Sequence, residues 1–161
     1  MRPGMTSGVS AQNTATTQTL FRVGRYTLRM FDIDLIRFVT GERHPPYGHR
    51  TGVFQAAYRL WRRDILARPD REEIRALLDW FEDHLAKPER LTPSRHPHGR
   101  NTAVSWVRAS ALEHVTQLRR LVKLVVAGGV AVDEQRTKRP GYIVYQDDQQ
   151  VVALPFADTP R

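Results

Sequence analysis

Residues 140–154 read PGYIVYQDDQQVVAL, and this stretch decides the fold class of the 161-residue chain. Pro-Gly is a turn sequence, and residues 142–145 alternate between two faces with the period of a strand. Asp147 and Asp148 have the composition of a hairpin tip, and residues 150–154 form an apolar return strand. The end of the chain is therefore predicted to be an antiparallel hairpin.

Three amphipathic helices are predicted upstream of this hairpin. Apolar residues recur every three to four positions within 51–65, from 70 to 87 and within 110–127. Asp70 and Ser110 each stand three residues before a glutamate, as in a capping box, and are expected to begin the second and third helices. In the third helix the expected inward residues are Leu112, Val115, Leu118, Val122 and Val125.

Shorter segments with strand character surround the helices. They occupy residues 20–30, 33–39, 102–107 and 130–137. Strands grouped at both ends of a chain, with helices between them, are typical of the α+β class. We expect a single α+β domain over 19–156, with a mixed or antiparallel sheet and about three helices packed on one face. Flexible tails are expected over 1–18 and 157–161.

The composition excludes several classes of protein. The chain has no cysteine, which rules out disulfides, thiolate zinc sites and cysteine nucleophiles. No apolar run approaches the roughly 20 residues of a membrane-spanning helix, and the polar N-terminus lacks the apolar core of a secretory signal. We therefore expect a cytoplasmic protein with no membrane partner. The sequence also contains no phosphate-binding P-loop, dinucleotide fingerprint, nucleophile elbow or zinc-protease motif.

Basic charge is in excess and unevenly distributed. The formal net charge is +8, and 22 of the 25 basic residues are arginine. Arginine suits phosphate recognition, although a GC-rich genome also favours it. Residues 21–63 and 87–123 each carry a net charge of +6, whereas residues 64–86 carry −4. If the two basic segments meet in space, they form one basic face for an anionic partner.

Residues 41–52, GERHPPYGHRTG, concentrate reactive side chains between a strand and a helix. Histidine suits proton transfer near neutral pH, and arginine beside a helix N-terminus suits an anion. The same loop can equally be a rigid turn with solvated histidines.

A second loop, 87–101, places a His-x-His pair between arginines. That positive charge disfavours a metal, and we predict no metal and no cofactor. The residues expected to contact an anion are Arg43, His44, Tyr47, His49, Arg50, Arg95, His96, His98 and Arg100.

The three tryptophans and one aspartate pair have two readings each. Trp61, Trp80 and Trp106 could stack on bases, but packing is the more ordinary role of such residues. We expect Trp80 and Trp106 to lie beside the core-facing positions of their elements. Asp147 and Asp148 could hold a metal, although aspartates at a hairpin tip are usually turn residues.

Three motifs carry a resemblance to other sequences. They are His-Pro-Pro-Tyr-Gly leading into Gly-Val-Phe-Gln-Ala-Ala at 44–57, Trp-Phe with His-Leu at 80–85, and the segment from Ala103 through the Pro-Gly-Tyr-Ile-Val-Tyr hairpin to Phe156. On these motifs the chain resembles a group of small uncharacterised bacterial proteins. The group has no known activity, so the resemblance implies a domain and no mechanism.

Three functional hypotheses follow. The first is a small basic protein that binds an anionic partner, nucleic acid before others, through loops 41–52 and 87–101. The second is a metal-independent hydrolase or nuclease in which His44 or His49 is the base and Arg50 stabilises the anion. The third is an interaction subunit of a phage-related or defence assembly, in which an acidic helix and basic faces pair between copies.

Overall fold

The computed structural model describes residues 34–43, 48–63, 65–88 and 102–160, together with the backbone of 22–23 and 26–27. The chain divides into two compact units, residues 1–30 and residues 31–161. In the first unit, β1 (Arg22–Val23) pairs antiparallel with β2 (Tyr26–Thr27). The segment predicted as one strand over 20–30 thus contains two short strands paired with each other.

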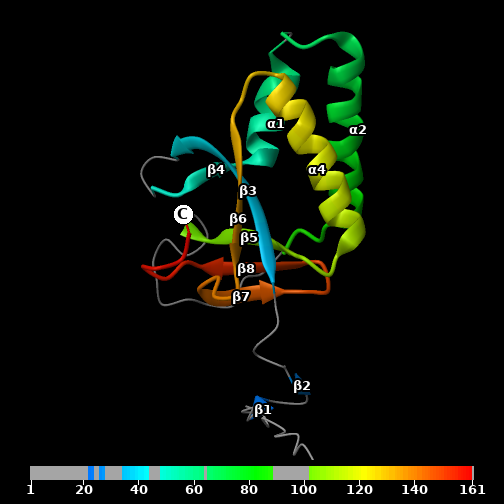
Figure 1. Cartoon of the computed structure of the whole chain (residues 1–161). Coiled ribbons are helices and arrows are strands. Elements are labelled where there is room, and N and C mark those ends of the chain that lie inside the picture. The colour runs from blue at the N-terminus through cyan, green and yellow to red at the C-terminus, as the bar shows by residue number, and fades with distance from the viewer. Residues whose placement is uncertain are drawn as a thin grey trace, which may run out of the picture. The chain divides into compact units, whose positions relative to one another are not determined.

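The second unit contains three helices among its described residues. They are α1 (Val53–Arg62), α2 (Arg68–His84) and α4 (Leu112–Ala127). Figure 1 shows them grouped on one side of the sheet, and they contact one another pairwise. The predicted α+β class, with about three helices on one face, is confirmed. No helix in the described ranges is long and apolar enough to cross a membrane.

The helices begin differently from the predicted capping boxes. α2 begins at Arg68 and has Pro69 in its first turn, where a missing amide hydrogen costs little. Asp70 therefore lies inside the first turn, where its charge suits the helix dipole, and it is not the cap. α4 has Ala111 as its N-cap and no side-chain capping bond, so the capping box predicted at Ser110 is wrong.

The sheet of the second unit has six strands, all paired antiparallel. They are β3 (Leu35–Arg43), β4 (Arg50–Gly52), β5 (Val104–Arg108), β6 (Val132–Thr137), β7 (Tyr142–Gln146) and β8 (Gln150–Leu154). β6 pairs with one edge of β3, and β8 lies between β5 and β7. In Figure 1, β5, β8 and β7 run across the direction of β3 and β6.

Two strands share the second edge of β3. β5 pairs there only with Leu35 and Ile36, and β4 pairs with Val39 and Arg43. The strands part between these positions, so the edge of β3 near Arg37 has no strand partner among the described residues. We call this gap between β4 and β5 the fork.

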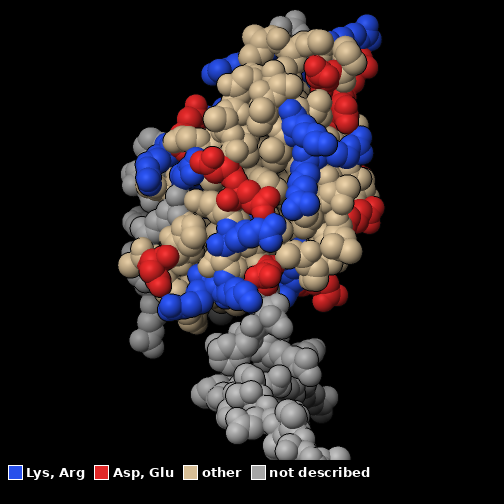
Figure 2. All heavy atoms as spheres, in the orientation of Figure 1, with Lys and Arg blue, Asp and Glu red and all other residues tan. Residues whose placement is uncertain are grey.

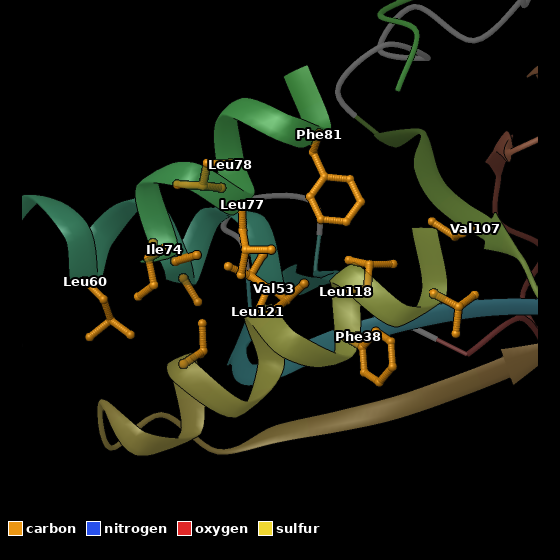
Figure 3. Close-up of a cluster of buried hydrophobic side chains, with 14 of the residues drawn as sticks. Phe38, Val53, Leu60, Ile74, Leu77, Leu78, Phe81, Val107, Leu118 and Leu121 are labelled. Carbon is orange, nitrogen blue, oxygen red and sulfur yellow. The ribbon is translucent and has the colours of Figure 1, made fainter. Parts of the chain in front are cut away.

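The main core lies between the helices and the sheet. Figure 3 shows apolar side chains of α1, α2 and α4 converging with Phe38 of β3 and Val107 of β5. The buried stripe predicted for the second helix is confirmed at four positions: Ile74, Leu77, Leu78 and Phe81.

Two expectations about packing are wrong. Leu112 is 74% exposed, because the buried stripe of α4 passes through His114 and Leu121 and helical steps of 100° turn Leu112 outward. Trp106 is fully buried, since it packs with Leu35 and other apolar residues in a second cluster. β5 therefore has buried residues on both faces, Trp106 on one and Val107 on the other, although Ser105 is exposed, and a strand pattern with one apolar face does not anticipate this.

Asp147 organises the predicted hairpin tip between β7 and β8. One carboxylate oxygen accepts hydrogen bonds from the amides of Gln149 and Gln150 at 2.8 and 2.7 Å, and the other accepts one from the Tyr145 hydroxyl at 2.9 Å. Burial alone would raise the pKa of Asp147, but the hydrogen bonds outweigh it and lower the pKa. The predicted turn role of Asp147 is confirmed.

The first prediction compares two leucines of α4. Leu121→Ala removes a fully buried side chain and should lower the free energy of unfolding by about 2–5 kcal/mol. Leu112→Ala carries the same change in helix propensity at an exposed site and should shift it by less than about 0.5 kcal/mol. Urea unfolding measures both, and equal losses would contradict the packing of α4.

The second prediction compares the two aspartates of the hairpin tip. Asp147→Ala should cost about 1.5–3 kcal/mol, because it removes hydrogen bonds to a charged group, whereas Asp148→Ala at an exposed site should cost less than about 0.5 kcal/mol. The pKa of Asp147 is depressed in the folded protein, so the advantage of wild type is present above pH 3.8, the ordinary pKa, and declines as pH falls through the lowered pKa. A pH series of urea unfolding experiments measures this, and a constant difference in acid would contradict it.

Candidate functional site

The structure describes three of the nine residues predicted to contact an anion: Arg43, His49 and Arg50. It also shortens the loop that carries them, because Gly41–Arg43 belongs to β3 and Arg50–Gly52 forms β4. Arg43 and Arg50 are register partners across this hairpin. The other six predicted residues lie outside the described ranges: His44, Tyr47, Arg95, His96, His98 and Arg100.

Arg50 holds three strands together. Its Nε donates to the carbonyl oxygen of Thr40 on β3 at 2.7 Å, and its Nη2 forms an ion pair with Asp133 on β6. Arg43 is exposed, and its Nη1 donates to the carbonyl oxygen of Gly48 at 2.8 Å. The hydrogen bonds of both arginines thus include contacts that fix the hairpin, and those of Arg50 reduce its availability for an incoming anion.

A cavity of about 210 Å³ lies at the fork. Its wall includes Ile36 and Phe38, which face the helices, and also Trp106, which packs in the second cluster. Because adjacent residues of a strand point to opposite faces, this cavity reaches both faces of the sheet where β4 and β5 part. We call it the fork cavity. Its polar lining residues are Arg37, His49, Gln55, Ser105 and Gln150, and no aspartate or glutamate is among the described residues that line it.

Arg37 is the charged residue that lines the fork cavity, and few contacts compensate its buried charge. Its Nη2 donates to the carbonyl oxygen of Arg50 at 2.8 Å, while its Nη1 is buried without a hydrogen-bond partner among the described residues. No carboxylate of those residues pairs with it. Burial, and secondarily the charge of Arg50, lowers the pKa of Arg37 to about 10. The guanidinium is still charged at neutral pH, so its burial costs free energy that an anion would offset.

Trp106 and the start of α1 line the same cavity. The Nε1 of Trp106 is buried and has no partner in the described part of the chain. α1 begins at the cavity wall with Gly52 as its N-cap, without a side-chain capping bond and without an acidic residue in its first turn. The first amide groups of a helix lack partners within the helix and carry its partial positive charge. The cavity therefore combines a cation, an indole N–H and a helix N-terminus.

Sequence reasoning identified His49 but missed Arg37 and Trp106 as residues of a site. The signal for Arg37 was a single charge inside the apolar run Leu-Ile-Arg-Phe-Val at 35–39, which predicts a buried cation wherever that run is a central strand. His49 lines the fork cavity and makes a contact within the chain.

The predicted basic face is only weakly developed in the described part of the chain. The four described ranges contain 17 basic and 14 acidic residues, so they account for +3 of the net charge of +8. Figure 2 shows acidic and basic side chains interspersed on the face in view. The acidic helix α2 is itself paired, for example Asp79 with Arg75 and Glu73 with Arg120. Within these ranges no three histidine, aspartate or glutamate side chains form a group that could hold a metal.

The third prediction concerns the stability cost of Arg37. Arg37→Met replaces a buried, unpaired guanidinium by an apolar side chain of similar length, so it should leave the free energy of unfolding unchanged or raise it by about 1–3 kcal/mol in anion-free buffer. Arg136→Met on β6 removes the same charge from an exposed site paired with Glu134 and should change it by less than about 0.5 kcal/mol. Urea unfolding at low salt measures both. A loss of several kcal/mol in Arg37→Met would show that Arg37 is held by contacts within the protein.

Comparison of the chain with protein-family models, with curated proteins and with solved structures found no match.

Proposed function

We propose that this protein binds an anionic partner, nucleic acid before others, and that the fork cavity receives one of its phosphate groups. The observation that carries the proposal is Arg37: it lines a cavity without an acidic lining residue, and its Nη1 is buried without a hydrogen-bond partner among the described residues. A buried donor without an acceptor costs about 1–3 kcal/mol, and more when it is charged. A phosphate oxygen that accepts from it recovers that cost on binding.

The surroundings of Arg37 favour phosphate over a neutral ligand. The first turn of α1 opens on the cavity with no acidic residue of its own, and helix N-termini are common phosphate-binding positions. The Nε1 of Trp106 adds a neutral donor, and His49 adds a side chain that becomes a cation on protonation. These groups reach the cavity from β3, α1 and β5 and from the residue preceding β4. A tetrahedral anion could thus be contacted from several sides.

Nucleic acid is the favoured partner because of the charge that lies beyond the cavity. The described ranges account for +3 of the net charge; of the remaining +5, the undescribed part of the loop, 89–101, contributes +2, residues 1–30 contribute +4 and the other residues contribute −1. Arginine-rich segments of this kind attract a polyanion over long distances and contribute most of the affinity for its backbone. Arg95 and Arg100 remain our proposed phosphate contacts in that loop.

A second candidate function is phosphodiester hydrolysis without a metal. It is favoured by one observation, the position of His49 in the wall of the cavity in which we place a phosphate. His49 would act as the base, together with His44. The anion-stabilising role predicted for Arg50 falls to Arg37 in this mechanism, because Arg50 is engaged by Thr40 and Asp133.

The fourth prediction tests binding at the fork. Wild type should bind a labelled single-stranded oligonucleotide at about 50 mM salt, and the affinity should fall steeply as salt rises. Arg37→Met should weaken binding by roughly tenfold and reduce the slope of log affinity against log salt by about one, since one phosphate contact is lost. Fluorescence anisotropy measures both quantities, and Arg136→Met controls for the change in net charge.

Two outcomes would contradict this proposal. The first is an absence of binding to DNA and RNA at about 50 mM salt. The second is an equal loss of affinity in Arg37→Met and Arg136→Met, which would indicate a general effect of charge. Recovery of intact oligonucleotide after incubation supports binding alone, whereas cleavage that is lost in His49→Ala supports the hydrolase.

A further inference from the structure

A second cavity, of about 270 Å³, adjoins the fork cavity. Phe54, Leu85, Ser105 and Gln150 line both cavities, so at most one layer of side chains separates them. The second cavity lies between α1 and α2 and extends to the segment that follows α2. We call it the aromatic cavity after the rings in its wall: Phe54, Tyr58 and Phe81.

The aromatic cavity differs from the fork cavity in its chemistry. Phe54 and Phe81 pack edge to face with ring centres 4.9 Å apart, and Leu78 and Leu85 complete an apolar wall. Such a surface suits a flat ring, because aromatic side chains contact the faces and edges of rings favourably. It offers little to a phosphate.

Three polar side chains interact at the rim of the aromatic cavity. The hydroxyl of Tyr58 donates to Glu82 at 2.8 Å, and the ammonium of Lys87 lies 3.5 Å from the same carboxylate. The hydrogen bond from Tyr58, followed by the charge of Lys87, lowers the pKa of Glu82, so Glu82 is a carboxylate at neutral pH. A carboxylate beside an aromatic surface can accept a hydrogen bond from the amino group of a base.

We infer that the ligand of this site is a nucleotide with a terminal phosphate, whose phosphate enters the fork cavity and whose base lies in the aromatic cavity. This inference rests on the proposed function, because it uses the same phosphate position. The two cavities, about 210 and 270 Å³, together fall in the size range of small-ligand sites. The site would therefore accept a free nucleotide or the phosphorylated end of a single strand.

Duplex DNA does not fit this arrangement. Its bases are stacked and paired, and its phosphates lie on the outside of the helix, so a base could reach the aromatic cavity only after unstacking. Arg37 lines the fork and its Nη1 is buried, so a phosphate that is to accept a hydrogen bond from Nη1 must enter the fork and displace the atoms that cover it. A phosphate at the end of a strand has the freedom to do so.

The experiment measures affinity by calorimetry for three small probes: inorganic phosphate, a nucleoside 5′-monophosphate and the matching nucleoside. Wild type should bind the monophosphate at least tenfold more tightly than phosphate, and the nucleoside should bind more weakly than the monophosphate. Tyr58→Ala should lower the ratio of monophosphate to phosphate affinity by roughly fivefold to a hundredfold, the usual effect of losing a stacked ring. Glu82→Gln, which keeps the shape of an exposed side chain, tests the hydrogen bond to the base.

Matched variants and longer probes separate the possible outcomes. Tyr142→Ala removes a tyrosine that is 56% exposed on β7, and it should leave the affinity ratio unchanged. A single-stranded oligonucleotide with a 5′-phosphate, compared with the same strand without it, distinguishes a strand end from a free nucleotide as the source of the ligand. A higher affinity for the strand that carries the 5′-phosphate supports the inference, with a strand end as the ligand.

Failure of the inference can be distinguished from failure of the proposed function. In one outcome, Arg37→Met abolishes phosphate binding but Tyr58→Ala has the same ratio of monophosphate to phosphate affinity as wild type. The phosphate site is then supported, and the nucleotide inference is overturned. If neither phosphate nor monophosphate binds wild type, and binding of an oligonucleotide does not depend on Arg37, both are overturned. Circular dichroism of Tyr58→Ala establishes that the variant is folded, and Glu82→Gln provides a second test of the base position if it is not.

Discussion

Each position on one edge of a β-strand can pair with only one neighbouring strand. This limit, on the edge of β3 that β4 and β5 share, determines much of the structure. β5 uses the first two residues of that edge and β4 uses the far end, so neither can continue past the other. The residues between them must face something other than a strand. α1 follows β4 without an intervening residue, which places its N-terminus at the same gap. The pairing of the strands therefore creates the cavity and also supplies the helix end that lines it.

The gap between β4 and β5 explains how the sheet accommodates Arg37. On a fully paired central strand, a cation on the face that it shares with Leu35 and Val39 would be enclosed by apolar neighbours and would cost more free energy than the strand could recover. At the fork its Nη2 reaches the carbonyl oxygen of Arg50, and the cavity leaves space for a counter-ion. Under the proposed function, the residual cost is the stability lost in a site that is prepared for an anion before the anion binds. Stability and binding should therefore respond to Arg37 in opposite directions.

Local patterns in the sequence predicted the elements well and the site poorly. The hairpin tip at Asp147 was predictable because the carboxylate bonds only to residues 145–150, so its chemistry is contained in a few neighbouring residues. Arg37 was not, because its surroundings depend on β4 and β5 dividing an edge, and these strands are far apart in the chain. Trp106 was misplaced for a related reason, since a short strand with buried residues on both faces has no clear periodicity that reveals which side chains are buried. Features that depend on pairing between strands far apart in the chain could not be predicted, whereas features set by neighbouring residues could.

Arg50 and Arg37 show how two arginines in one hairpin can have different roles. Asp133 neutralises Arg50 and fixes it across β3, whereas Arg37 has no carboxylate partner among the described residues. Under the proposed function, an anion that approaches the hairpin gains most by entering the fork, because the part-buried charge of Arg37 is less screened by water than an exposed charge and the N-terminus of α1 adds to it. An arginine on an open surface would attract any polyanion and would discriminate little among shapes. In that proposal, the position of Arg37 in the fork restricts the ligand to groups small enough to enter, and this favours a terminal phosphate over the continuous backbone of a duplex.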